Sequence, residues 1–115
     1  MITIILVHPQ HSTPIQSWKF EHEAVISIGR AADNQVVLYS AVVSRYHAQL
    51  RQANKSWEIV NLGANGTYLE GQRLTESAPV VDGAIVRLAQ SGPQLQIRFE
   101  AVPVQPVEKS ALQQQ

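Results

Sequence analysis

Three short polar segments combine residue types that could bind an anion. The first contains Gly29 and Arg30, directly after the apolar run VISI. The second is 44–47 (SRYH), and the third is 61–67 (NLGANGT). A guanidinium offers planar donors that match phosphate oxygens, a serine hydroxyl is a small adaptable donor, and an asparagine amide can bond an extended main chain. These residue types predict a pocket for a phosphate group carried on a peptide.

The local charge favours such a pocket although the whole chain is neutral. The 115 residues contain 9 Lys and Arg against 9 Asp and Glu. Between residues 24 and 57, the charged residues are Arg30, Asp33, Arg45, Arg51 and Lys55. This local excess of positive charge suits one small dianion. A nucleic acid backbone demands many phosphate contacts, so we expect no nucleic-acid partner.

The elements that must position these segments are predicted to be β-strands. Apolar residues recur with period two, most clearly at Leu95, Ile97 and Phe99. Similar runs at 2–7, 24–28, 36–38, 67–69 and 84–88 are separated by turn-forming residues, and 48–59 predicts a hairpin that turns at 53–56. Residues 8–17 are interpreted as a polar loop. The pattern predicts an all-β, two-sheet β-sandwich, with loops gathered at its two ends.

Length and composition limit the chain to one core. With 44% apolar residues, a chain of 115 residues can fill a single core without disulfides or metals. We predict one domain over residues 1–102. The last residues, 103–115, contain two prolines and a glutamine run without periodicity, so they are predicted to be a flexible tail or linker. We expect a monomeric domain, and the tail suits one joined to a longer chain.

Composition also bears on the compartment. The absence of cysteine excludes disulfides, thiol nucleophiles and thiolate metal sites, and it fits a reducing environment. The early apolar run 2–7 is shorter than a signal sequence needs, and no run reaches the roughly 20 residues of a membrane helix. We therefore expect a soluble, cytoplasmic protein with no membrane insertion.

The order of the three motifs resembles the forkhead-associated (FHA) domain family. The motifs I-G-R, S-R-x-H and N-G-T, the last followed by a strand and a glycine, occur in the family's order within residues 26–74. The resemblance extends over about residues 2–101. It implies a β-sandwich of about eleven short, mostly antiparallel strands whose apical loops bind phosphothreonine in a partner protein. It also implies a preference for threonine over serine, through a small cavity that takes the γ-methyl group.

The resemblance implies two sets of site residues. The peptide-binding set is Arg30, Ser44, Arg45 and Asn65. The supporting set is Gly29, His47, Gly66 and Thr67. Within these sets, Arg30 and Ser44 would bind the phosphate and Arg45 would lie beside it. Asn65 would bond the main chain of the ligand, and His47 would hold the loops in register.

Two positions depart from the family pattern. Ala64 stands where a serine or threonine usually offers another hydroxyl. The loss of one neutral donor costs about 1 kcal/mol, or about fivefold in affinity. Glu70 precedes Gly71 where asparagine is common. We expect Glu70 to alter the support of the loop rather than a contact with the ligand.

Other functions are less well supported by the residues. Ser44 and His47 could act as nucleophile and base, but no carboxylate lies nearby in sequence and no G-x-S-x-G turn surrounds the serine, so we predict no enzyme. His8, His11 and His22 lack the neighbouring ligands of a metal site, and no metal or cofactor is expected. The alternative that remains is a phosphate-independent interaction or scaffold domain that uses a sheet face.

Overall fold

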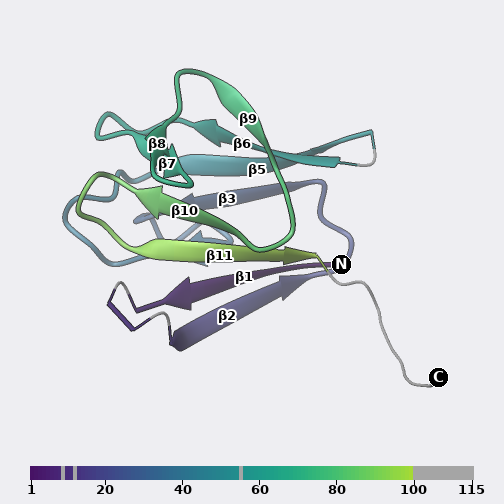
Figure 1. Cartoon of the computed structure of the whole chain (residues 1–115), viewed down its shortest axis with the longest axis horizontal. Coiled ribbons are helices and arrows are strands. Elements are labelled where there is room, and N and C mark those ends of the chain that lie inside the picture. Colours follow the sequence, from purple (N-terminus) through teal and green to yellow (C-terminus); the bar gives the residue numbers. More distant parts are fainter. Residues whose placement is uncertain (9, 12, 55, 100–115) are drawn as a thin grey trace.

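The computed structural model describes residues 1–8, 10–11, 13–54 and 56–99, which form two packed β-sheets (Figure 1). The predicted all-β sandwich is confirmed, and the part of the chain described contains eleven strands and no helix. The strands are β1 (Ile2–Val7), β2 (Pro14–Phe20), β3 (Val25–Gly29), β4 (Val36–Val37), β5 (Ala48–Ala53), β6 (Ser56–Asn61), β7 (Thr67–Leu69), β8 (Gln72–Arg73), β9 (Ser77–Val80), β10 (Ala84–Leu88) and β11 (Gln94–Phe99). The predicted tail at 103–115 and the predicted domain boundary at residue 102 lie outside the described residues.

The two sheets have simple strand orders. One sheet has the order β2-β1-β11-β10-β7-β8, and the other has the order β4-β3-β5-β6-β9. All pairs are antiparallel except β3 with β4, which is parallel. The predicted hairpin is β5 with β6, whose register pairs Leu50 with Ile59.

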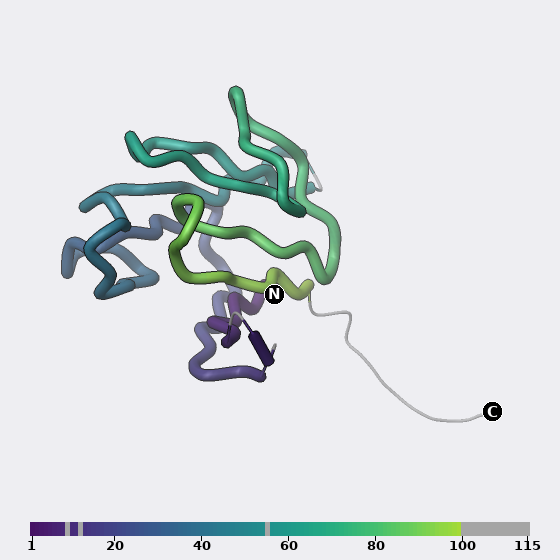
Figure 2. Tube along the Cα trace, turned by 60° about the vertical axis from the view of Figure 1, so that its left-hand side comes forward, coloured from purple at the N-terminus to yellow at the C-terminus, as the bar shows by residue number. Residues whose placement is uncertain are grey.

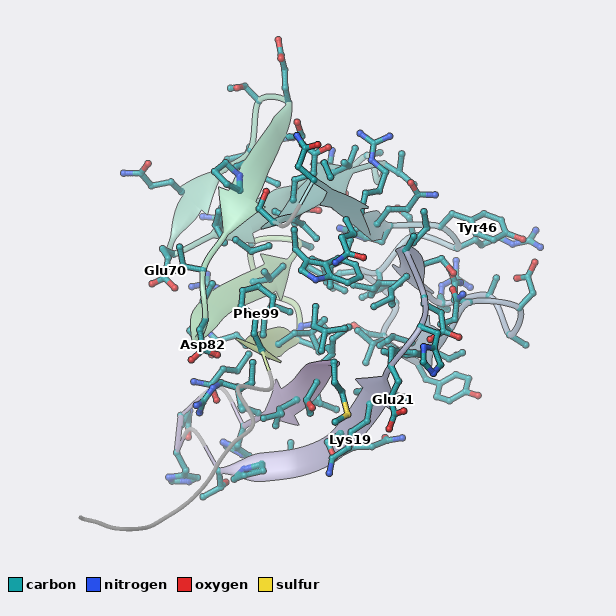
Figure 3. All side chains as sticks on the ribbon, turned by 90° about the vertical axis from the view of Figure 1, so that its right-hand side faces the viewer. Lys19, Glu21, Tyr46, Glu70, Asp82 and Phe99 are labelled. Carbon is teal, nitrogen blue, oxygen red and sulfur yellow. The ribbon has the colours of Figure 1, made fainter. Side chains whose placement is uncertain are left out.

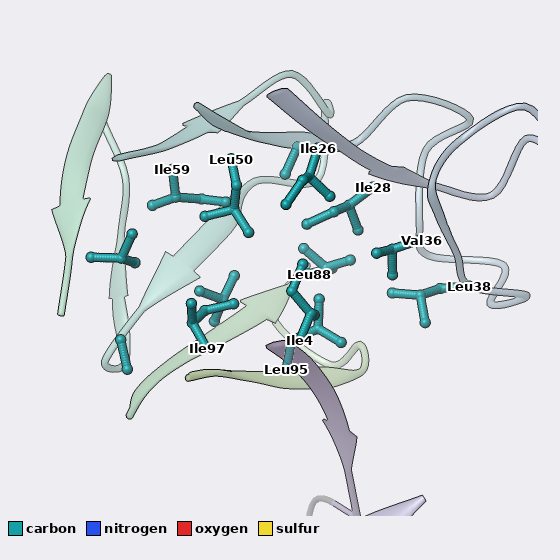
Figure 4. Packing of buried hydrophobic residues seen from close by; sticks show 14 of the residues in the cluster. Ile4, Ile26, Ile28, Val36, Leu38, Leu50, Ile59, Leu88, Leu95 and Ile97 are labelled. Atoms are coloured by element: carbon teal, nitrogen blue, oxygen red, sulfur yellow. The ribbon is translucent and has the colours of Figure 1, made fainter. Parts of the chain in front are cut away.

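Period-two alternation places the core between the sheets. In β10, for example, Ala84, Val86 and Leu88 are buried while the residues between them are partly exposed. Figure 4 shows isoleucine and leucine side chains from both sheets meeting in this layer. Each such side chain contributes about 1.5–3 kcal/mol when it is fully buried. The core thus fixes both sheets, and with them the loops that connect their strands.

The prediction of a loop over residues 8–17 is wrong in its second half. Strand β2 begins at Pro14 and pairs along β1, with Trp18 opposite Ile4. It is the outermost strand of its sheet, and four of its first five residues, 14–17, are exposed. An edge strand with so little burial lacks the apolar alternation by which a strand is predicted from sequence.

The three polar segments lie at one end of the sandwich. Strand β3 ends there, β5 begins there, and β6 leads through a loop into β7 (Figure 1, left). In Figure 2, the chain on either side of β4 projects from the body of the sandwich at this end. We call this the apical end.

Candidate functional site

Arg30 is held against the segment that carries Ser44. The backbone N–H of Arg30 donates to the Ser44 carbonyl oxygen at 3.0 Å. The Nε of its side chain donates to the Val43 carbonyl oxygen, also at 3.0 Å. The Arg30 residue is nevertheless exposed, and no hydrogen bond within the described residues uses its terminal Nη groups. The contact with Val43 therefore orients the guanidinium and leaves its outer donors available.

The backbone of Arg45 is held by the same loop. Its carbonyl oxygen accepts from the Ala31 N–H at 3.1 Å and from Asn34 Nδ2 at 2.8 Å. The Asn34 side chain also donates to the Ala31 carbonyl oxygen at 2.8 Å, and the residue is buried. Asn34 therefore ties the two apical segments together, while the side chain of the exposed Arg45 remains at the surface.

His47 is a structural residue with both ring nitrogens occupied. Its Nδ1 accepts from the Ser44 backbone N–H at 3.0 Å, so its Nε2 carries the hydrogen and donates to the Gly66 carbonyl oxygen at 2.8 Å. The residue is fully buried, and this burial lowers the pKa of the imidazole, partly offset by the Gly66 carbonyl. The ring is thus held neutral, and neither nitrogen is free to take a proton from the Ser44 hydroxyl.

The loop between β6 and β7 is closed by its own polar side chains. The hydroxyl of Thr67, which is fully buried, donates to Asn61 Oδ1 at 2.7 Å. Asn61 Nδ2 donates to the Gly63 carbonyl oxygen at 3.1 Å. Gly66 has a φ of 85°, in the left-handed region that favours glycine. Gly66 and Thr67 therefore contribute to the closed shape of this loop.

The third loop packs against the second through Asn65. Asn65 Nδ2 donates to the Val42 carbonyl oxygen at 2.9 Å, and the residue is exposed. A Cβ at Gly63 would lie only 2.9 Å from Ser44 Oγ, so these loops are in close contact. Ala64, between Gly63 and Asn65 in the third loop, is exposed and lines a cavity together with Asn65. The structure thus brings the three predicted segments together.

Glu70 is bonded to strand β10 through both its backbone and its side chain. It adopts a φ of 51° at the turn after β7, and its N–H donates to the Ile85 carbonyl oxygen at 2.9 Å. Its carboxylate accepts the Ile85 N–H at 2.7 Å. Figure 3 shows Glu70 on the side of the molecule opposite Tyr46. The side chain therefore extends the pairing of β7 with β10 beyond the last residue of the strand.

The apical arginines have no acidic partner among the described residues. The ion pairs found there are Arg51–Glu58, Arg98–Asp82 and His22–Glu21. Asp33, the acidic residue of the apical segments, instead accepts hydrogen bonds from the Tyr46 hydroxyl at 2.8 and 3.1 Å, and these bonds raise the tyrosine pKa. The Asp33 carboxylate is therefore bonded to Tyr46 and forms no ion pair with Arg30 or Arg45.

The histidines and acidic residues of the described part of the chain form no metal cluster. No three His, Asp or Glu side chains there lie close enough together to hold a metal ion. His8 and His11 stack with their ring centroids 4.6 Å apart. Nor does any described segment form a helix with the length and apolar character needed to cross a bilayer.

The arrangement agrees with comparisons to known proteins. The family model described as FHA domain matches residues 26–89, which is more than half of the chain. The chain belongs to the FHA domain family. All of the predicted site residues lie within the matched range of the FHA domain.

The FHA domain is similar to several mycobacterial proteins. It is 37% identical over 67 residues to the FHA domain-containing protein FhaB of Mycolicibacterium smegmatis, covering 57% of this chain and 43% of FhaB. It is 26% identical to Mycobacterium tuberculosis EmbR in complex with a low affinity phosphopeptide, with a TM-score of 0.66, covering 88% of this chain and 25% of EmbR. A third structure, from an analysis of phosphothreonine-dependent FHA domain interactions, has a TM-score of 0.72 at 22% identity and covers 88% of this chain and 98% of that one. The chain spans less than half the length of the FhaB that it matches.

Two asparagines of the site were not predicted from sequence. Asn34 and Asn61 bond main-chain groups on or beside the segments that carry the predicted residues. Asn34 is bonded to a residue 11 positions away in sequence, and Asn61 to one 2 positions away, so the two hydrogen bonds share no sequence spacing. The available signal was an asparagine in a predicted loop, since this side chain readily bonds nearby backbone groups.

Proposed function

We propose that this FHA domain is a phosphothreonine-binding module that recognises a threonine-phosphorylated segment of a partner protein through its apical loops. The observation that carries the proposal is Arg30. Its guanidinium is fixed by Val43 beside Ser44, it is exposed, and no described acid pairs with it. The 26% identical EmbR, solved in complex with a phosphopeptide, supports the same conclusion.

Each predicted residue has a role in this proposal. The outer donors of Arg30 and the hydroxyl of Ser44 bind the phosphate, and Arg45 adds a second positive charge beside it. A phosphorylated threonine brings about −1.5 to −2 charges and three acceptors. Each charge-assisted hydrogen bond contributes about 1.5–3 kcal/mol, which an unphosphorylated threonine cannot gain. Asn65 bonds the main chain of the ligand through its carbonyl oxygen and its second amide hydrogen, since the first amide hydrogen is bonded to the Val42 carbonyl oxygen.

Calorimetry with a library of phosphothreonine peptides tests the proposal. We expect a dissociation constant on the micromolar scale, about −8 kcal/mol. Dephosphorylation should weaken binding by at least about 100-fold, since it removes two or more charge-assisted bonds. A phosphoserine version of the best peptide measures the preference for threonine. Raising the salt concentration should also weaken binding, because exposed charges are screened.

Variants assign the binding to the apical loops. Arg30→Ala combined with Ser44→Ala should abolish phosphate-dependent binding. Arg51→Ala is the matched control, since Arg51 lies on a strand and pairs with Glu58 at 3.5 Å. Unchanged affinity after dephosphorylation, or in the double variant, would contradict the proposal and favour a phosphate-independent scaffold domain.

A further inference from the structure

Asp33 lies in a tight turn that contacts the segments of both apical arginines. The Asn34 N–H donates to the Ala31 carbonyl oxygen at 3.2 Å, which closes a turn with Asp33 at its third position. Arg30 directly precedes this turn, and the Ala31 N–H donates to the Arg45 carbonyl oxygen at 3.1 Å. Asp33 is exposed, so a carboxylate is built into the surface that has to attract a phosphate.

The side chain of Asp33 is held by the hydroxyl of Tyr46. The hydroxyl donates to the carboxylate, and its oxygen lies 2.8 and 3.1 Å from the two carboxylate oxygens. This contact is the main cause of the raised pKa of Tyr46, which the positive charge of Arg45 partly offsets. Asp33 and Arg45 therefore both lie near the same hydroxyl, yet the described residues form no ion pair between them.

Arg30 offers the carboxylate an alternative partner. The ends of a tight turn are less than about 7 Å apart, a distance that an aspartate and an arginine side chain span together. The terminal Nη groups of Arg30 have no hydrogen bond among the described residues, and a guanidinium attracts a carboxylate by charge. An ion pair between Asp33 and Arg30 would occupy the donors that a phosphate needs, and a ligand would have to break it.

We infer that Tyr46 is a positioning residue of the phosphate site, because its hydroxyl holds the Asp33 carboxylate away from the apical arginines. The hydroxyl does not remove the negative charge of Asp33 but fixes where that charge lies. Residue 46 is the position that the S-R-x-H motif leaves open, so the motif assigns it no role. The inference rests on the proposed function, since it concerns the same arginines, and it needs no contact between Tyr46 and the ligand.

Two variants break the same hydrogen bond with opposite expected results. Tyr46→Phe removes the hydroxyl, keeps the ring and releases the Asp33 carboxylate. It should weaken binding of a phosphothreonine peptide by about two- to fivefold, because the phosphate must then displace an exposed ion pair. Asp33→Ala removes the bond and the carboxylate together, so it should bind the peptide at least as tightly as the wild type. Calorimetry with one peptide measures both affinities.

A double variant and a control complete this comparison. Tyr46→Phe combined with Asp33→Ala should bind as tightly as Asp33→Ala alone, because no carboxylate remains to be held. Tyr39→Phe removes the hydroxyl of another tyrosine, one that is 86% exposed in the chain after β4, and should keep the wild-type affinity.

Salt separates an effect of charge from a distorted loop. Exposed charge pairs are screened by salt, so the loss of affinity in Tyr46→Phe relative to the wild type should shrink between about 0.05 M and about 0.5 M salt. A loss of the same size at both salt concentrations would show that the hydroxyl acts through the shape of the loop, and the inference would be wrong.

The pKa of Tyr46 checks the hydrogen bond in solution. Because the Asp33 carboxylate raises this pKa, Asp33→Ala should lower it toward the ordinary 10.0, which an NMR titration of the tyrosine rings measures. An unchanged pKa would show that Asp33 is not bonded to Tyr46 in solution, and the inference would then be wrong whatever the affinities.

The outcomes distinguish this inference from the function on which it rests. If Tyr46→Phe and Asp33→Ala weaken binding equally, the hydrogen bond serves as a tether of the loop, so the role given to Tyr46 is wrong and phosphothreonine binding stands. The same conclusion follows if Tyr46→Phe binds as tightly as the wild type. If the wild type binds no phosphopeptide, the proposed function is wrong, and the inference about Tyr46 is wrong with it.

Discussion

His47 couples the shape of the site to the charge on one imidazole. Its Nδ1 must accept from Ser44 and its Nε2 must donate to Gly66, so only the neutral ring satisfies both contacts. Protonation would give the ring a second N–H, at Nδ1, which would point at the Ser44 N–H in place of accepting from it. It would also place a positive charge on a buried group. The backbone position of Ser44 therefore depends on the protonation state of His47.

We predict that acidification destabilises the domain through His47. Its pKa in the folded chain is lower than the ordinary 6.5, so the unfolded chain binds the proton more readily. The free energy of unfolding should be constant above about pH 7 and should fall below about pH 6.5, by at most about 1.4 kcal/mol per pH unit. Urea unfolding between about pH 7.5 and about pH 5.5 measures this slope.

Two histidine variants identify the source of that slope. His47→Asn should flatten the pH dependence, although it lowers stability at every pH. His22→Asn replaces a histidine whose side chain is 92% exposed and should keep the wild-type slope. An equal slope in wild type and His47→Asn would show that another group causes the pH dependence.

Ala64 is the second residue-scale determinant, and restoring a hydroxyl there should strengthen binding. Ala64 is exposed between Gly63, which lies against Ser44 Oγ, and Asn65. We expect Ala64→Thr to increase affinity for a phosphothreonine peptide by about fivefold through one added hydrogen bond. Fluorescence anisotropy measures the change. Affinity for the dephosphorylated peptide should not increase. As a control, Ala53→Thr, at the end of β5 far from the apical loops, should leave affinity for the phosphothreonine peptide unchanged.

Single residues differ in how far the sequence alone could predict them. Arg30, Ser44 and Asn65 could be predicted as site residues because each lies in a short motif whose residue types match an anion or a peptide backbone. Asn34 could not, since its bond to the Arg45 carbonyl oxygen joins residues 11 positions apart whose approach no local pattern specifies.

At the scale of elements, the apical loops are in close contact with one another. One close approach is at Gly29, the last residue of β3. A Cβ there would overlap the Arg45 carbonyl oxygen and would lie 2.9 Å from Asn34 Nδ2. Strand β3 can therefore support the first two apical segments only while residue 29 has no side chain.

We predict that Gly29→Ala reduces both stability and binding. Relieving the overlap must move the segment that carries Arg45, at a cost of about 1–3 kcal/mol in unfolding free energy. Phosphopeptide affinity should fall by about tenfold, because that movement also displaces the neighbouring Ser44. Returning Ser44 to its place when the peptide binds costs a similar amount of free energy. Urea unfolding and calorimetry on the same samples measure the two effects.

Gly71→Ala is the informative comparison for this variant. Gly71 has a φ of 83° but no neighbouring atom within 4 Å of a Cβ. It should lose about 1 kcal/mol of stability from backbone strain alone and keep its affinity. If Gly29→Ala bound the peptide as tightly as Gly71→Ala, close approach at residue 29 would not be what positions the site.

The strands that sequence analysis missed share a place in the fold. The missed strands are β2, β8 and β9. Strands β2 and β8 are the two edges of one sheet, and β9 is an edge of the other. Only one of the four residues of β9 is buried, and Pro79 lies within it, which is tolerated at an edge but argues against a strand in sequence. The inner strands β1, β5, β6, β10 and β11 were predicted because burial on one face imposes the alternation that the sequence displays.

At the scale of the whole molecule, the core of the described residues extends into the last described strand, β11. The last residue of the buried cluster is Ile97, and the Phe99 N–H is bonded to Asp82 at 2.9 Å. Figure 3 shows Asp82 beside Phe99 where β11 ends. We therefore predict that a chain of residues 1–102 has the same thermal midpoint and the same phosphopeptide affinity as the full sequence. Calorimetry of both chains tests this, and a lower midpoint in the shorter one would place the domain boundary further along.

The pairing of β1 with β11 places Ile2 directly opposite Phe99. Residues paired in this way have Cα atoms about 4.5–5.5 Å apart, so the chain enters and leaves the sandwich at almost the same point. That point is at the opposite end from the apical loops (Figure 1). The domain could therefore be spliced into a surface loop of another protein without forcing apart the two ends of the host chain, and its binding face would point away from the host.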